Sequence, residues 1–510
     1  MIVKGGLGSD VAAAFGNRRK RADGLLLESG WCSDYGFNTT QQNFVSVVNR
    51  TLQGYCDRNL SIHKLHLDLA WVSLPVFSRP LHLDLWWVSR PVVSLLDKWI
   101  PIIAALNIKA FKLTFSLYNR LYYDLPSAVF LAESLEELHL CKCRLSPVES
   151  FRLKRLRTFT LEFVKVDGGT FEKITSGCPL LRRLVLRSCE GLRNVRLSEE
   201  ALPRLKHFEL SNYYQRVKGR SIEFDVLNLE NVIINCPWIW SHCQSVFLFS
   251  CLTSLSLWNV ILSSESFDLL SFGCPTLARL TLCHCSGFEE FHLTSDSVKW
   301  LTISSSEIPL KGASICAPNL VNFHFLTHGS QVPDTLSFMI TTTKNWHSHV
   351  SLFSSEDDPD FDVNLWFFKL RRMLKALSGS RISLSLKMDG SPLNVPCSDA
   401  DYNHLLGNHP PVVVDNLDFS TRKCRTASWY SGFTNGLFRV CRPRHISGCR
   451  LVSKSAKNKH MLSEFQFNIF LANMSLGTGP YFWRHDLEQV HVKTVKGKYG
   501  SSCSGRTFRN

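Results

Sequence analysis

Two short clusters of cysteine and histidine are the residues of this chain whose types and spacing best suit chemistry. In the first cluster, His139, Cys141 and Cys143 alternate along one segment. The second is the run Cys283–Cys285, which reads Cys-His-Cys. Imidazoles and thiolates bind zinc, but a zinc finger needs a second ligand pair at a defined spacing, and neither cluster has one nearby. We therefore interpret both clusters as structural, and we expect no metal site and no cofactor.

The sequence also contains no catalytic signature. It has no G-x-x-x-x-G-K-[ST] loop to hold a phosphate, no G-x-S-x-G turn to expose a serine nucleophile, and no H-E-x-x-H pair to bind a catalytic zinc. No other set of residues suggests a nucleophile with its base. We predict a protein that is not an enzyme and has no catalytic residues.

Both clusters fall on a pattern that recurs through the middle of the chain. Between Leu135 and Cys143 the sequence reads L-x-x-L-x-L-x-x-C. Copies of this frame follow at intervals of 21 to 25 residues, inside the roughly 20–29 residue period of leucine-rich repeats. The frames begin at Leu135, Leu156, Leu181, Leu205, Leu229, Leu252, Leu277, Val298 and Leu320. In some copies a proline two residues before the first leucine suits a turn ahead of the strand, at Pro179, Pro203, Pro275 and Pro318.

The frame predicts how its residues are arranged in space. The alternation in L-x-L places the leucines on one side of a short strand and the x residues on the other. One such unit cannot bury its apolar side, but stacked copies bury it against each other. The predicted fold class is α/β: a leucine-rich-repeat solenoid (horseshoe) with parallel strands on the concave face, plus a smaller C-terminal α+β region.

Four regions follow from where the frame is strong and where it fades. Residues 1–42 are expected to be a flexible tail. Residues 43–134 are predicted to form an N-terminal cap with degenerate repeats, and they contain a 16-residue tandem duplication that begins at Leu65. The repeat array covers residues 135–330. Residues 331–510, where the frame dissolves, are predicted to form a basic α+β domain.

The x residues of the frame are the candidate binding residues, because they point to the concave face. Tryptophan and arginine among them favour protein recognition, since these residue types often dominate binding energy. The alternative is that much of this face is merely solvated. The candidates are Glu137, His139, Thr158, Glu162, Arg183, Arg187, His207, Glu209, Asn231, Trp258, Arg279, Trp300 and His324.

The net charge of +15 is concentrated towards the C-terminus. No acidic residue lies between Asp418 and Glu464, while arginine and lysine recur there. Such a patch can meet an acidic protein, nucleic acid or a membrane surface. Basic and aromatic residues are mixed here, as in nucleic-acid binders, but the aromatics share no single-face period. Nucleic acid is therefore the less favoured partner. The patch comprises Arg439, Arg442, Arg444 and Arg450.

Composition limits the class of protein further. The chain has 510 residues, of which 45% are hydrophobic and 20% charged, so it is globular and too long for one ordinary core. No run of eighteen apolar residues is present, so we expect no membrane partner. The N-terminus lacks the apolar core of a secretory signal, and the 18 cysteines then suit a reducing compartment. We predict a cytoplasmic or nuclear protein.

The frames around Gly177–Cys189 and Gly273–Leu277, with the upstream run Asn43–Leu52, resemble plant F-box/leucine-rich-repeat proteins over roughly residues 43–330. Such proteins are substrate receptors of SCF-type ubiquitin ligases: F-box helices hold the Skp adaptor and the repeats hold the target. The resemblance therefore implies a target protein on the concave face.

The F-box pattern of that family is the part that we do not find. It would take about forty residues beginning Leu-Pro, whereas the residues before Asn43 offer only Gly24–Leu27 and Trp31. We expect the F-box to be absent or truncated, so the Skp adaptor and cullin would be partners only if an F-box is supplied upstream. The predicted function is a protein-binding repeat scaffold that resembles a receptor's substrate-recognition part. The alternative is a nucleic-acid-associated repeat protein that uses the basic C-terminal domain.

Overall fold

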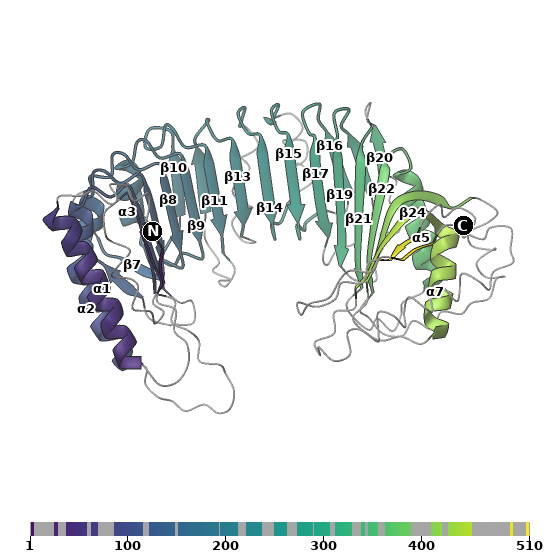
Figure 1. Ribbon diagram of the computed structural model, residues 1–510. Coiled ribbons are helices and arrows are strands. Elements are labelled where there is room, and N and C mark those ends of the chain that lie inside the picture. The colour runs from purple at the N-terminus through teal and green to yellow at the C-terminus, as the bar shows by residue number, and fades with distance from the viewer. Residues whose placement is uncertain are drawn as a thin grey trace. The chain divides into compact units, whose positions relative to one another are not determined.

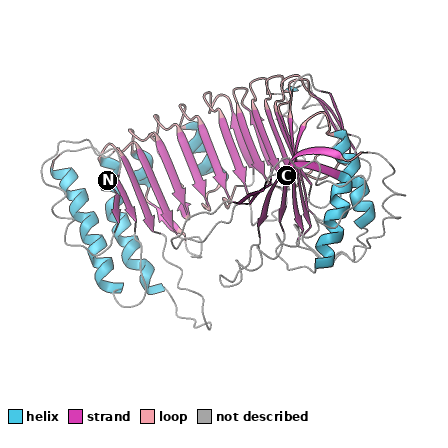
Figure 2. Cartoon of the chain, turned by 45° about the vertical axis from the view of Figure 1, so that its right-hand side comes forward, coloured by secondary structure: helices cyan, strands magenta, loops and turns pink. Residues whose placement is uncertain are grey.

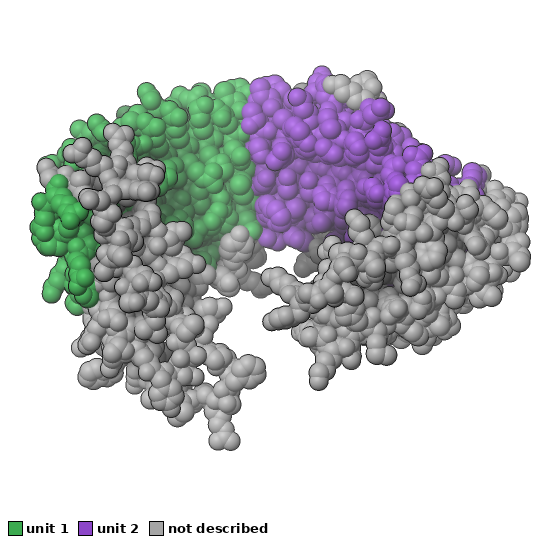
Figure 3. All heavy atoms as spheres, viewed as in Figure 1, with its two compact units in different colours: residues 1–252 green, residues 253–510 purple. Residues whose placement is uncertain are grey.

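The computed structural model is described in two compact units, residues 1–252 and residues 253–510 (Figure 3). The described residues are 2–4, 25–28, 37–58, 63–69, 86–115, 122–147, 151–192, 194–212, 221–236, 249–262, 273–288, 290–305, 312–328, 338–341, 345–354, 363–388, 410–420, 427–450, 490–492 and 506–508.

Unit 1 is built on a ladder of parallel strands, in which each strand pairs with the next (Figure 1). Parallel neighbours need a connection that returns to the same end of the sheet, which the 21–25 residue repeat provides from Glu137 onwards. The ladder runs through β1 (Ile2–Lys4), β2 (Leu25–Glu28), β3 (Lys64–Leu69), β4 (Ala110–Phe115), β6 (Glu137–Cys141), β8 (Thr158–Glu162), β9 (Arg183–Arg187), β11 (His207–Ser211) and β13 (Asn231–Asn235).

Unit 2 has a parallel ladder of the same kind. It runs through β14 (Ser254–Trp258), β15 (Arg279–Cys283), β17 (Trp300–Ser305), β19 (Asn322–His328), β21 (His347–Ser354), β22 (Arg381–Met388), β23 (Val412–Ser420) and β24 (Cys441–Arg450). A separate two-stranded antiparallel pair is formed by β25 (Val490–Val492) and β26 (Arg506–Phe508).

The register of both ladders aligns the predicted frames residue by residue. Leu138, Phe159 and Leu184 are neighbours on successive strands of unit 1, and each is at most 1% exposed. Leu280 and Leu301 are neighbours in the same way in unit 2. Full burial of one such side chain stabilises the fold by about 1.5–3 kcal/mol, so the stacked leucines supply the core that no single repeat could form. The predicted leucine-rich-repeat fold is confirmed.

Several ladder strands end in a sharp turn just before the ninth frame position. The residue there adopts a left-handed backbone, with φ of 61° at Lys142, 49° at Ser188 and 53° at His284. The following cysteine then turns inward: the thiol of Cys189 donates to the carbonyl of Leu161 at 3.5 Å, and that of Cys285 donates to Leu257 at 3.4 Å. The ninth-position cysteines are therefore part of the repeat's own turn.

Beyond these turns the chain forms short parallel strands that make smaller sheets. In unit 1, β5 (Tyr123–Leu125) pairs with β7 (Cys143–Leu145), and β10 (Asn194–Ser198) pairs with β12 (Ser221–Asp225). In unit 2 the corresponding sheet holds β16 (Glu290–Thr294), β18 (Gly312–Cys316) and β20 (Phe338–Thr341). The repeats that carry these strands thus contribute more than their main ladder strand.

The helices of unit 1 lie mainly beside its N-terminal strands (Figure 2). Trp99 donates its indole N–H to Asn49 Oδ1 at 2.6 Å, which links the first two helices, and Tyr123 donates its hydroxyl to Asp97 at 2.8 Å. A later helix is capped by Asp167, whose carboxylate accepts the backbone N–H of Thr170 at 2.9 Å. These helices are α1 (Phe37–Asp57), α2 (Trp86–Ala105), η2 (Ser127–Leu131) and α3 (Gly168–Ser176).

The parallel ladder of unit 2 does not end at residue 330, where the sequence frame fades. Strands β21 to β24 continue it, with α5 (Val363–Ala376) between β21 and β22 and α7 (Ala427–Val440) between β23 and β24. Phe367 and Phe433 pack between these helices with ring centroids 5.6 Å apart. A boundary at 330 therefore does not separate two sheets. Backbone hydrogen bonds between strands do not require leucine at fixed positions, and buried residues still alternate along β22 after the leucine spacing is lost.

One expectation for the N-terminal region also differs from the structure. Residues 1–42 contain β1 and β2, which pair with each other and with β3, so the stretch is not a tail throughout. The described parts of the duplication are residues 65–69 of the first copy, which lie in strand β3 (Lys64–Leu69), and residues 86–89 of the second copy, which begin helix α2; these are different positions of the 16-residue unit.

Candidate functional site: the polar face of the ladders

The x positions of the strands form one face of each ladder, which we call the polar face. In β15 the side chains of Leu280 and Leu282 are buried, whereas that of Arg279, the first residue of the strand, is exposed. The same alternation of buried leucines and more exposed x residues holds along β6 and β14. All thirteen candidate residues lie on this face. Glu137 to Asn231 belong to unit 1, and Trp258, Arg279, Trp300 and His324 belong to unit 2.

In unit 1 the candidates meet in an ionic network across four strands. Arg187 on β9 lies between two carboxylates: its Nη1 donates to Glu162 Oε1 at 2.6 Å, and its Nε and Nη2 donate to Glu209 at 2.6 and 3.0 Å. His139 on β6 extends the network, with Nε2 3.5 Å from Glu162 Oε2. A guanidinium that bridges two carboxylates in this way gives up most of its capacity to bind anything else.

The electrostatics of this network favour its charged form. His139 and Arg187 hold the pKa of the Glu162 carboxyl at about 2, against the opposing effect of burial. Glu209 contributes most to raising the pKa of Arg187, and its side chain is only 8% exposed. A carboxylate buried to that degree needs its partner, so the network is a structural part of the unit 1 face.

The remaining unit 1 candidates surround this network. Glu137 and Arg183 are exposed, whereas Thr158 and Asn231 are half-buried. His207 lies beside Arg183, and burial, together with that positive charge, lowers the pKa of its imidazole. His207 is thus favoured in its neutral form, in which it can both donate and accept a hydrogen bond.

In unit 2 the candidates leave large side chains open to solvent. Trp258 on β14 is 36% exposed and Trp300 on β17 is 38% exposed. The guanidinium of Arg279 lies over the ring of Trp300, 5.2 Å from its centroid. Exposed tryptophans in the middle of a sheet face are unusual, and they mark a surface suited to a partner.

Two histidines follow on the same face. His324 on β19 and His349 on β21 meet edge to face with ring centroids 4.4 Å apart. Burial is the main cause that lowers the pKa of both imidazoles, and Asp418 opposes it at His349. Sequence reasoning named His324 but missed His349, His347 and Arg381, which continue the face beyond residue 330. The alternation of Ile382, Leu384 and Leu386 was the signal that could have placed them.

The four arginines of the predicted basic patch are not alike in the structure. Arg444 on β24 is exposed and forms an ion pair with Asp415 at 3.0 Å. Arg442 on β24 and Arg439 on α7 are half-buried. The side chain of Arg450 lies outside the described residues. The three arginines whose side chains are described, Arg439, Arg442 and Arg444, therefore do not form a single exposed cationic surface.

The cysteine and histidine clusters take structural positions. Burial raises the pKa of the Cys141 thiol to about 11 and that of Cys285 to about 12, which disfavours the thiolate that a zinc ion needs. Over the described residues, no three histidine, cysteine or acidic side chains come together in a metal-binding arrangement. Within that part of the chain, no helix has the length and apolarity needed to cross a membrane.

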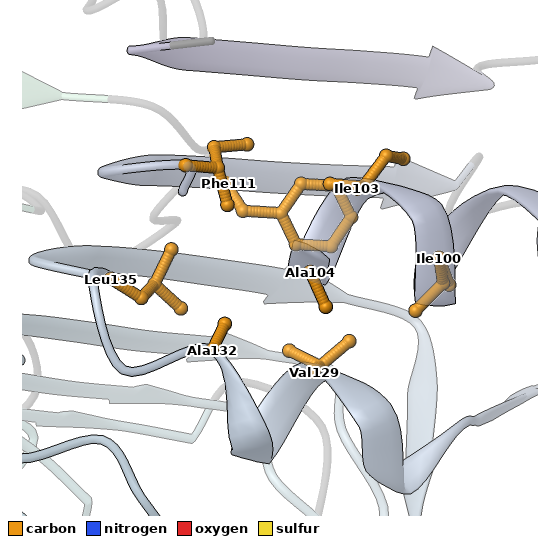
Figure 4. A pocket seen from close by; sticks show the side chains of 8 residues that line it. Ile100, Ile103, Ala104, Phe111, Val129, Ala132 and Leu135 are labelled. Atoms are coloured by element: carbon orange, nitrogen blue, oxygen red, sulfur yellow. The ribbon is translucent and has the colours of Figure 1, made fainter. Parts of the chain in front are cut away.

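A small apolar cavity of about 10 Å³ lies in the cap of unit 1, between α2, β4 and η2 (Figure 4). In the figure the Phe111 ring lies beside Ile103. It is about the size of one water molecule and has no polar lining, so we interpret it as a packing gap rather than a ligand site. Its lining residues are Ile100, Ile103, Ala104, Ile108, Phe111, Val129, Ala132 and Leu135.

Comparison with known proteins agrees with this architecture. A family model described as "At1g61320/AtMIF1, LRR domain" matches residues 79–238. The fold of the chain is that of a leucine-rich-repeat solenoid. The match begins ahead of the first strong frame at Leu135 and covers the upstream strand β4, but not β3.

Two Arabidopsis thaliana proteins illustrate the relatives of this chain. F-box/LRR-repeat protein 13 is 27% identical over 118 residues, which is 22% of this chain and 26% of the relative. F-box/LRR-repeat protein At3g03360 is 30% identical over 123 residues, 23% of this chain and 24% of the relative. The predicted resemblance to plant F-box/leucine-rich-repeat proteins is confirmed, although the chain spans about a quarter of the length of the relatives it matches.

Proposed function

We propose that this protein is a non-catalytic scaffold whose polar face binds a target protein, as in the substrate-recognition part of an SCF-type ubiquitin-ligase receptor. One observation carries the proposal: Trp258 and Trp300 are exposed on the unit 2 face, with Arg279 beside Trp300. Tryptophan and arginine are the side chains that most often dominate the energy of protein interfaces. A leucine-rich-repeat ladder presents them on a rigid surface, which lowers the entropic cost of binding.

The relatives support the same reading by their names, which combine an F-box with leucine-rich repeats. The proposal includes a cytoplasmic or nuclear location, where such a scaffold would meet its target. Coupling to a ubiquitin ligase would require an F-box that holds the Skp adaptor and, through it, the cullin. Purified Skp adaptor mixed with the full chain tests this part directly: co-elution supports coupling through this chain, and its absence leaves target binding alone.

Target binding is tested by comparing three full-length baits in quantitative affinity capture: the wild type, a W258A/W300A variant and an L227A variant. Leu227 is 55% exposed in unit 1 and is not a polar-face residue, so its substitution controls for the loss of an exposed hydrophobic side chain. We expect proteins that the wild type and L227A capture alike and the double variant loses. Circular dichroism checks that the double variant is folded. If the folded double variant captures the same proteins at the same level, the polar face of unit 2 is not the binding surface.

A further inference from the structure

One straight row of side chains crosses the polar face of unit 2. In the strand register Arg279 lies beside Trp300, Trp300 beside Asn322, Asn322 beside His347, and His347 beside Arg381. We call these five residues the Arg279–Arg381 row. All five are exposed. The row therefore runs perpendicular to the strands, as a continuous accessible line with an arginine at each end.

The strands that carry this row hold no acidic residue. Strands β14, β15, β17, β19, β21 and β22 contain neither Asp nor Glu, and acids return in the ladder at Asp415 and Asp418 on β23. Among the described residues Arg279 and Arg381 have no acidic partner, and Arg279 lies over the Trp300 ring instead. The positive charge of the row is thus not offset within its own strands, unlike that of Arg187 in unit 1.

Small hydroxyl side chains lie beside the row. Ser256, Thr281 and Thr302 occupy the next polar-face position of β14, β15 and β17, and all three are half-buried. Hydroxyl groups can donate to carboxylates or to peptide carbonyls. Because these side chains are small, Trp258 on β14 and Trp300 on β17 are the large exposed side chains of this part of the face.

We propose that an extended, carboxylate-rich segment of the partner protein lies along the Arg279–Arg381 row. The inference rests on the proposed function and specifies the chemistry of the segment that the face takes. Arg279 and Arg381 are four strand steps apart, about 19 Å at a spacing of about 4.8 Å per step. An extended chain rises about 3.3 Å per residue, so acidic side chains roughly six residues apart would reach both arginines at once.

A peptide fits this face better than a nucleic acid does. Nucleic-acid binding draws much of its affinity from many basic side chains that neutralise phosphates. The six acid-free strands supply Arg279, Arg381 and Lys387, and Lys387 already lies over the Phe353 ring at 5.5 Å. Two accessible guanidiniums around an exposed tryptophan suit a short segment with a few carboxylates and an apolar side chain between them.

The probe for this proposal is a fluorescently labelled ten-residue peptide with two Glu pairs about six residues apart and a Leu between them. Anisotropy with the full chain should show saturable binding that weakens as salt rises, because exposed charge contacts are screened. The peptide with Gln in place of Glu should bind at least tenfold more weakly. Equal binding of the Gln peptide, or binding of a phosphoserine peptide or oligothymidylate but not of the Glu peptide, would overturn the proposal.

Charge reversal assigns the binding to the row. The R279E/R381E variant should lose about tenfold or more in affinity for the Glu peptide, as two attractive exposed contacts become repulsive. The matched control is R372E/K375E: both residues are exposed on α5, and Arg372 also lies over an aromatic ring, that of Phe368 at 5.8 Å. The control should bind like the wild type. Equal affinities of the two folded variants would place the binding elsewhere and contradict the proposal.

This outcome is separable from that of the proposed function. If W258A/W300A abolishes target capture while the Glu peptide fails to bind, the face binds a target of different chemistry and only the present inference fails. If the Glu peptide binds the row but target capture ignores both tryptophans, the protein-binding role of the face as proposed fails.

Discussion

The polar faces of unit 1 and unit 2 are built on the same kind of parallel ladder but differ in what their charges contact. On unit 1, Arg187 is bridged by Glu162 and Glu209 on the neighbouring strands. On unit 2, Arg279 lies over an exposed tryptophan and has no acidic partner among the described residues. The same kind of ladder thus carries charged side chains that stabilise the face in unit 1 and charged side chains that remain accessible to a partner in unit 2.

The largest effect on stability should come from the leucine core, which is built in the same way in each unit. Leu184→Asp in unit 1 and Leu280→Asp in unit 2 each place a carboxylate at a position with no solvent exposure. We expect a loss of more than about 4 kcal/mol in the free energy of unfolding, because the charge is desolvated and each repeat depends on its neighbours. Denaturant unfolding followed by circular dichroism measures it.

The controls for this pair are one residue away. Arg183→Asp and Arg279→Asp put the same carboxylate on the exposed face of the same strands, and they should change stability by less than about 1 kcal/mol. If core and face substitutions were equally tolerated, the frame leucines would not be the common core of the ladders.

The second prediction tests the contrast between the faces directly. Arg187→Ala leaves the buried Glu209 without its guanidinium and should cost about 3 kcal/mol, whereas Arg279→Ala should cost no more than about 0.5 kcal/mol. Thermal and denaturant unfolding of both variants measure the difference. Adding Glu209→Gln to Arg187→Ala should recover part of the loss. Equal costs at Arg187 and Arg279 would remove the distinction between a structural and an accessible arginine.

The sequence predicted most of the ladder because the spacing of the frame indicates where each strand lies and which of its residues face the core. Nine frames placed nine strands, and the candidates at their x positions all lie on the polar face. What failed was the end of the array: past residue 330, strands such as Arg381–Met388 keep the alternation but lose the leucine spacing, so the frame no longer identifies them. For that reason Arg381, one end of the Arg279–Arg381 row, was not among the candidate residues.

The difference between the faces could not be predicted from the frame. Arg187 and Arg279 both stand at x positions, and the frame does not show which neighbours their side chains contact. That depends on register: Glu162, Arg187 and Glu209 become partners only when β8, β9 and β11 align at the same x position. A pattern within one repeat does not show which side chains of different strands contact each other.

The third prediction concerns a turn that both units use. Gly191 and Gly287 have φ of 91° and 92°, and a Cβ on Gly191 would lie 2.5 Å from the carbonyl oxygen of Val166. Ala at either position should cost about 1–3 kcal/mol, in similar amounts in the two units. Gly54→Ala, in α1 with open space around it, should instead be neutral or stabilising. Unequal costs at Gly191 and Gly287, measured by denaturant unfolding, would show that the two turns are not equivalent.

The smallest effect is a difference in acid sensitivity between the faces. The pKa of Glu162 is held at about 2, below its ordinary value of 4.5, because His139 and Arg187 favour the carboxylate. A lowered pKa in the folded state means that Glu162 stabilises the fold fully above about pH 4.5, and that this contribution is lost as the pH falls towards 2. Stability of the wild type should therefore fall more steeply over this window than that of Glu162→Gln, which has no carboxyl to protonate. On unit 2, Arg279→Gln should leave the wild-type slope unchanged, since no carboxylate within the described residues pairs with Arg279. Denaturant unfolding at pH 5, 4 and 3 gives the three slopes, and parallel curves for the wild type and Glu162→Gln would mean that the unit 1 network does not hold its carboxylate in the charged form.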